Sequence, residues 1–186
     1  MNKPASISFA VAGPARITTA EFERMCRADV FGDAKIELVD GELQRMMSPM
    51  AQHAGRQASV IGKLYAALGD GAARLLGETG IDLGNDTVIG CDAVLLFAPM
   101  KEHRWLRPEE VVLVIEVSET TRDRDMGVKR VKYATARIPH YWVIDGERSV
   151  VHVWGEPVNG DYAQISTVRF GEPLAVPGTG QTIVIA

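Results

Sequence analysis

A run of apolar residues that leads into a carboxylate limits what this chain can fold into. Residues 111–118 read VVLVIEVS, with five consecutive apolar residues, mostly β-branched, before Glu116. Such a run is typical of a strand buried on both faces near the middle of a sheet. Burying the Glu116 carboxylate without a partner would cost several kcal/mol or force it to take up a proton. The sequence therefore predicts that Glu116 pairs with a cation or binds a metal ion.

Length and composition predict one globular α/β domain over residues 1–186. The chain is 46% hydrophobic and 24% charged, which is ordinary for a globular protein with a sizeable core. Residues 1–16 are expected to form a loose arm and not a signal peptide, because this segment lacks an apolar core followed by a cleavage site. No apolar run approaches the roughly 18 residues needed to span a membrane. The two separated cysteines fit a reduced compartment, so we expect a cytoplasmic protein that does not cross a membrane.

The spacing of apolar residues predicts helices and strands in a mixed order, with helical spacing in some stretches and short apolar runs in others. Asp40-Gly41 and Asp145-Gly146 are strong hairpin signals. Helices are predicted over 19–28, 50–68 and 122–136. Strands are predicted over 35–39, 42–46, 74–76, 80–83, 87–89, 92–97, 111–117, 140–144, 149–154, 162–168 and 182–185, with glycines and Asn85-Asp86 read as the turns between the short ones.

Two apolar strands, 24 residues apart, each carry one carboxylate at an end: Asp92 and Glu116. A pair of hard oxygen ligands on neighbouring strands suits Mg²⁺, with water or substrate phosphate completing the octahedron. Such an ion would stabilise the charge that develops when water attacks a phosphodiester. The alternative is structural: Asp92 caps a turn and Glu116 pairs with an arginine.

A lysine near these carboxylates is expected on the helix that follows the 111–117 strand. Residues 116 and 118 point to one face of the strand, and a nuclease with a Glu-x-Lys strand motif would carry lysine where Ser118 stands. Lys129 shares a helix face with Asp125 and Tyr133, because the three are spaced i, i+4. Lys132 is a fallback for the amine. Alternatively, Lys129 is one of several solvated basic residues.

Nucleic-acid contacts are expected from a local basic patch, because the net charge of −4 gives no global attraction to phosphate. Residues 122–137 hold six basic residues against two acidic ones, and Arg122, Arg124 and Arg130 are the candidate contacts. A charge run of this kind is also typical of a solvated helix face. Trp105, in the polar loop before the central strand, could stack on a base or contact a partner.

The chain resembles the Uma-type family of restriction-endonuclease-like proteins, within the PD-(D/E)xK nuclease superfamily. Four stretches carry the resemblance: residues 36–43 (IELVDGEL), 91–94 (CDAV), 113–118 (LVIEVS) and 125–145 (DMGVK through Tyr133 to PHYWVID). The resemblance implies a restriction-endonuclease-like mixed sheet flanked by helices, with extra hairpins at the N- and C-terminal ends. It also implies that the nuclease lysine has moved from the strand to the helix, which matches Ser118 and Lys129.

The resemblance further implies site residues and a reaction. Asp92 and Glu116, with the Val117 carbonyl, would bind Mg²⁺ (or Mn²⁺) for hydrolysis of DNA phosphodiester bonds. Glu37 would help bind the metal or orient water, although it could equally be a solvent-facing hairpin residue. His53 could contact phosphate or assist proton transfer, or be structural. A homodimer would suit an endonuclease that cuts both strands.

Two positions depart from the family pattern. Cys91 stands where proline usually precedes the metal-binding aspartate, and residues 118–121 read SETT where Ser-Pro-Ser-Thr is usual. The extra acid, Glu119, would repel substrate phosphate. The alternatives are therefore a catalytically degenerate nuclease-fold module that binds nucleic acid or protein, and a structural subunit of a larger mobile-element or defence system.

Overall fold

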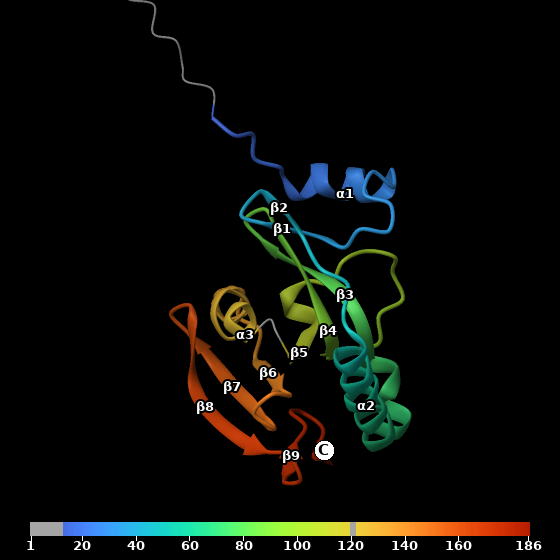
Figure 1. The fold of residues 1–186 in the computed structure, drawn as a ribbon, viewed down its shortest axis with the longest axis vertical. Coiled ribbons are helices and arrows are strands. Elements are labelled where there is room, and N and C mark those ends of the chain that lie inside the picture. Colours follow the sequence, from blue (N-terminus) through green and yellow to red (C-terminus); the bar gives the residue numbers. More distant parts are fainter. Residues whose placement is uncertain (1–12, 120–121) are drawn as a thin grey trace, which may run out of the picture.

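A mixed eight-stranded sheet forms the centre of the computed structural model, which describes residues 13–119 and 122–186 (Figure 1). Its strands are β1 (Ile36–Val39), β2 (Glu42–Arg45), β3 (Leu75–Gly84), β4 (Thr87–Leu96), β5 (Val111–Ser118), β6 (His140–Asp145), β7 (Val150–Val158) and β8 (Asp161–Arg169). They are ordered β2-β1-β4-β5-β6-β7-β8, and β3 also pairs with β4. β5 and β6 run parallel, and the other neighbouring strands of the sheet are antiparallel.

Helical segments cover both faces of this sheet. They are α1 (Thr19–Arg27), α2 (Ala51–Leu68), η1 (Gly69–Arg74), η2 (Pro108–Glu110), α3 (Arg122–Arg124), the π-helix η3 (Asp125–Lys129) and α4 (Arg130–Thr135). The crossover between the parallel strands β5 and β6 runs through α3, η3 and α4. A small second sheet pairs β9 (Pro173–Ala175) with β10 (Thr182–Val184).

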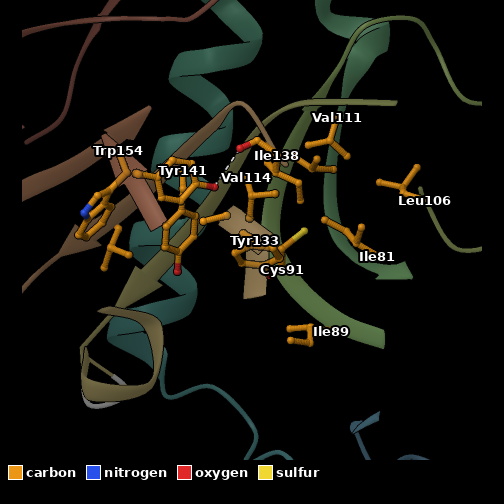
Figure 2. Close-up of a cluster of buried hydrophobic side chains, with 14 of the residues drawn as sticks. Ile81, Ile89, Cys91, Leu106, Val111, Val114, Tyr133, Ile138, Tyr141 and Trp154 are labelled. Carbon is orange, nitrogen blue, oxygen red and sulfur yellow. Dashed lines mark hydrogen bonds between the residues drawn. The ribbon is translucent and has the colours of Figure 1, made fainter. Parts of the chain in front are cut away.

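Two hydrophobic cores lie on opposite faces of the sheet, because successive strand residues point to opposite sides. One core packs Tyr133 of α4 against Val114 and Tyr141 (Figure 2). The other packs Leu64 of α2 and the β9–β10 sheet against Ile115. Every residue of β5 is buried. The prediction of a central strand covered on both faces is therefore confirmed.

Local sequence signals explain most element boundaries. The Thr18 hydroxyl accepts the backbone N–H of Glu21 while the Glu21 carboxylate accepts that of Thr18, which forms a capping box at the start of α1. Asp40 and Gly41 both have positive φ angles in the β1–β2 turn, as the Asp-Gly signal predicts. Within the described residues, no helix has the length and apolarity that crossing a bilayer would require.

The predicted short strands between residues 74 and 97 are wrong in their boundaries. They form two continuous ten-residue strands, β3 and β4, joined at Asn85-Asp86. Gly77, predicted as a turn, lies inside β3 together with Gly80. An added Cβ would come within 3.3 Å of the Ile61 side chain at Gly77 and within 2.8 Å of the Trp105 side chain at Gly80. As a consequence, Asp92 lies inside β4 and not at its start. β9 was not predicted from the sequence.

The predicted N-terminal arm can be described only in part. Residues 13–16 are exposed and belong to no helix or strand, whereas residues 1–12 lie outside the described part of the chain. Arg16 contacts the backbone carbonyl of Asp40, and Ile17 donates its N–H to the Gly41 carbonyl at 2.8 Å. The chain is thus anchored to the β1–β2 turn just before α1 begins.

Candidate active site

The predicted carboxylates and the predicted lysine line one cavity of about 900 Å³. The cavity lies where β4 and β5 separate. Their last pair is Ala93 with Ile115, and the adjacent residues Asp92 and Glu116 are not paired. Asp92 bridges the separating strands, because its Oδ2 accepts the Val117 N–H at 2.6 Å. The separation opens space beside both carboxylates.

The crossover helix supplies the contacts of Glu116. The Lys129 Nζ donates to Glu116 Oε1 at 2.8 Å, and the Tyr133 hydroxyl donates to the same oxygen at 3.0 Å. The Lys129 Nζ also donates to the Gly90 carbonyl at 2.9 Å. The side chains of Glu116 and Lys129 are only 4% and 6% exposed. Asp125, Lys129 and Tyr133 are all buried, as their common helix face predicts.

Burial dominates the electrostatics of this pair. Burial raises the pKa of Glu116, and Asp92 and Asp125 act in the same direction, whereas Lys129 lowers it. Burial also disfavours the charged form of Lys129, but the carboxylates of Glu116 and Glu37 outweigh it and raise the pKa of the lysine. Lys129 is therefore a permanently charged donor at neutral pH.

Glu37 joins the cluster from β1. Its Oε1 accepts the Gly90 N–H at 3.1 Å and lies 3.8 Å from the Lys129 Nζ. Its other oxygen contacts the Arg124 guanidinium, which also lies 2.9 Å from the Met46 sulfur. Glu37 is thus a buried hairpin residue whose carboxylate is fixed by one backbone amide and two cations.

The first turns of α2 close the opposite side of the cavity. His53 Nε2 lies 3.3 Å from Asp92 Oδ1, and the Gln57 side chain donates to the Asp92 backbone carbonyl at 2.9 Å. Gln57 was missed by sequence reasoning, although its position one helical turn after His53 places it on the same face. Arg56 pairs with Glu119 at 2.6 Å. The acid that departs from the family pattern therefore has its charge balanced within the protein.

The other predicted site residues are spread over different places. Arg124 points into the cavity, but Lys132 pairs with Asp40 beside a separate small cavity. Arg122 donates to the buried Asp145 at 3.0 Å, and Arg130 lies 3.2 Å from Asp161.

Trp105 has a packing role in this structure. It lines the cavity, but its ring stacks on Phe22 with centroids 5.3 Å apart. Its other contacts include the close approach to Gly80 described above.

A family model for Uma2, described as a putative restriction endonuclease, matches residues 19–185. The chain belongs to the Uma2 family. The fold agrees with a crystal structure of a putative nuclease belonging to DUF820 from Anabaena variabilis, at a TM-score of 0.67 and 18% sequence identity. That match covers 91% of this chain and 95% of the other. No curated protein sequence matches the chain. The predicted family and the predicted sheet flanked by helices are therefore confirmed.

The charges in the cavity of this Uma2-family chain fit a divalent cation. Within the part of the chain that the structure describes, no three His, Cys, Asp or Glu side chains are grouped closely enough to hold an ion unaided. Two carboxylates nevertheless satisfy the ligand needs of Mg²⁺, which keeps several waters or takes substrate oxygens. Seven acidic side chains line the cavity against four permanent cations: Asp29, Glu37, Glu78, Asp92, Glu116, Glu119 and Asp125 against Lys35, Arg45, Arg124 and Lys129. A divalent ion would balance that excess of negative charge.

Proposed function

We propose that this chain is a Mg²⁺- or Mn²⁺-dependent endonuclease that hydrolyses DNA phosphodiester bonds. The observation that carries the proposal is the meeting of Asp92, Glu116 and Lys129 in a single cavity, from two strands and the helix between β5 and β6. Membership of a family described as putative restriction endonucleases supports the same reaction class. The substrate would be DNA, bound by its phosphates.

Asp92 and Glu116, with the Val117 carbonyl, would hold the ion. When bound, the ion would stabilise the charge on the scissile phosphate and lower the pKa of a bound water. Lys129 would donate a hydrogen bond to a phosphate oxygen or to the attacking water, as a charged group whose raised pKa keeps its proton in place. Glu37, whose Oε1 lies 3.8 Å from the Lys129 Nζ, would help to position the amine.

His53 and Tyr133 would have supporting roles. His53 lies beside Asp92 at the cavity wall, so its imidazole could pass a proton to the leaving oxygen. Tyr133 would keep the Glu116 carboxylate in place through its buried hydrogen bond. Arg124, which faces the cavity, could contact phosphate, whereas Arg122 and Arg130 would contact the DNA backbone outside it.

Plasmid nicking tests the proposal. We expect relaxation of supercoiled DNA that requires Mg²⁺ or Mn²⁺ and falls roughly 10²-fold or more in the Asp92→Asn, Glu116→Gln and Lys129→Met variants. Lys132→Met is the matched control, because this lysine lies one turn away from Lys129 and pairs with Asp40 outside the cavity. Undiminished nicking by a folded Glu116→Gln protein would refute the catalytic proposal.

A second candidate is a nuclease-fold module that binds without hydrolysing. The observation that favours it is that Glu116 Oε1 already accepts hydrogen bonds from Lys129 and Tyr133, so the protein itself supplies a cation to this carboxylate. Calorimetric titration with Mn²⁺ distinguishes the two functions. Binding that is lost in Asp92→Asn supports the endonuclease, and the absence of binding to the wild-type protein supports the module.

A further inference from the structure

β8 forms one outer edge of the central sheet (Figure 1). It pairs with β7 along its whole length, and no other strand of residues 13–119 and 122–186 pairs with it. One side of its backbone therefore presents N–H and C=O groups that lack a neighbouring strand, except at Arg169, whose N–H and C=O are both bonded to Glu172. Such an edge is a template for pairing with another chain unless the sequence protects it.

The sequence of β8 contains none of the usual protection. Its seven interior residues, YAQISTV, include no charge, proline or glycine, and its pairing with β7 shows no register shift. Ile165, at the centre of the strand, is 65% exposed. By contrast, the outer strand β2 is only four residues long. β2 and β8 thus differ in length, one of the features that limit edge-to-edge association.

The ends of β8 carry opposite charges at equal distances from Ile165. In an antiparallel pair of β8 strands centred on Ile165, Asp161 of each copy would face Arg169 of the other, and the two Ile165 side chains would meet. Opposite charges placed directly across an antiparallel pair are stabilising. Asp161 is about half exposed beside Arg130 and can accept a second guanidinium.

We propose that two copies of this chain associate through β8, antiparallel and centred on Ile165. The arrangement is two-fold symmetric and closes, as isologous dimers do. It joins the two central sheets into one continuous sheet through main-chain hydrogen bonds, with the side chains setting the register. The proposal does not depend on the proposed nuclease activity.

Sedimentation velocity of the full chain tests the interface. We expect a dimer for the wild-type protein and a monomer for Ile165→Lys, which brings two like charges together at the symmetry axis. Tyr65→Lys is the matched control, because Tyr65 is 62% exposed but lies on α2, away from this edge; it should remain dimeric. A wild-type monomer at every concentration, or a folded Ile165→Lys dimer, would overturn the proposal.

Disulfide trapping tests the register without adding a charge, so it remains decisive if Ile165→Lys fails to fold. In a Cys26→Ser background, which removes the exposed cysteine, Ile165→Cys should give a covalent dimer on oxidation because the two sulfurs face each other. Ala163→Cys alone should not, because residue 163 faces residue 167 of the other copy, and adding Thr167→Cys should restore the link. Cross-linking by Ala163→Cys alone, without cross-linking at 165, would overturn the proposed register.

Discussion

At the residue scale, charged side chains of this protein are paired inside the fold more than their sequence context indicates. Residues 122–137 read as a basic surface, yet Arg124 contacts Glu37 in the cavity and Lys129 is buried beside Glu116. A count of charges cannot distinguish these buried, paired residues from solvated ones, because their partners come from strands far away in the sequence. The i, i+4 spacing of Asp125, Lys129 and Tyr133 predicted that they share one helix face, and the structure shows that this face is buried.

Asp145 makes the stability of the protein depend on pH. Burial would raise the pKa of this carboxyl, but hydrogen bonds from the Arg148 backbone and from the Arg122 and Arg148 side chains outweigh burial and lower it below 3.8. A carboxyl whose pKa is lower in the folded state than in the unfolded state stabilises the folded protein at pH values above its unfolded-state pKa. This stabilisation is lost as the pH falls through the folded-state pKa. Asp145 should therefore contribute fully at neutral pH and lose its contribution below pH 3.8.

We expect Asp145→Asn to lower the free energy of unfolding by about 2 kcal/mol at neutral pH, as for hydrogen bonds to a charged group. The difference from the wild-type protein should shrink below pH 3.8 in urea titrations. Asp123→Asn is the control, because its side chain is fully exposed, and the free energy should change by less than about 0.5 kcal/mol. A difference for Asp145→Asn that stays constant across these pH values would contradict this account.

At the element scale, helices and hairpins were predictable from the sequence, whereas strand lengths were not. The Asp40-Gly41 turn is a local signal whose prediction is confirmed, and the capping box of α1 is a local signal of the same kind. Gly77 looked like a turn because glycine is common there. Gly77 and Gly80 instead allow close packing against Ile61 and Trp105 within β3, which no local pattern reveals. The π-helical turn η3 likewise has no sequence signature of its own.

The glycine at position 80 should be required by the Trp105 ring. We expect Gly80→Ala to destabilise the protein by about 1–3 kcal/mol, because the new Cβ would lie 2.8 Å from Trp105 Cδ1 and displace the ring from Phe22. Urea unfolding and tryptophan fluorescence measure the two effects. Gly62→Ala is the matched control inside α2, because a Cβ added there meets no side chain within 4 Å. This change should stabilise the protein by roughly 0.5–1 kcal/mol. Equal effects of the two changes would argue against this packing role.

At the scale of the whole molecule, a continuous sheet brings together segments from residue 37 to residue 129 around one cavity. This sheet supports the prediction of one domain over residues 1–186, which stays a prediction. The resemblance to the Uma-type family gave the architecture, because its motifs span most of the chain. It could not give the separation of β4 from β5 at Asp92, which depends on how two long strands twist apart.

Ion binding should be visible in the stability of the entire protein. If Asp92 and Glu116 bind Mn²⁺, the ion should raise the unfolding free energy by about 2.7 kcal/mol at a concentration 100 times its dissociation constant. Thermal unfolding with and without a chelator measures the effect. Asp92→Asn should abolish the shift, and Lys132→Met should preserve it. A shift of equal size in Asp92→Asn would place the ion elsewhere.

The entry of Lys129 from a helix has a consequence for how such proteins can diverge. In a strand, a side chain points to one face of the sheet or to the other. In a helix, successive side chains are rotated about the helix axis by about 100°. Deleting one residue within η3 would rotate the ammonium group away from Glu116 while the sheet and both acids stayed in place. Relatives that retain both acids can therefore lose the amine through the deletion of one codon, and the acids alone are a poor guide to which relatives keep all three groups together.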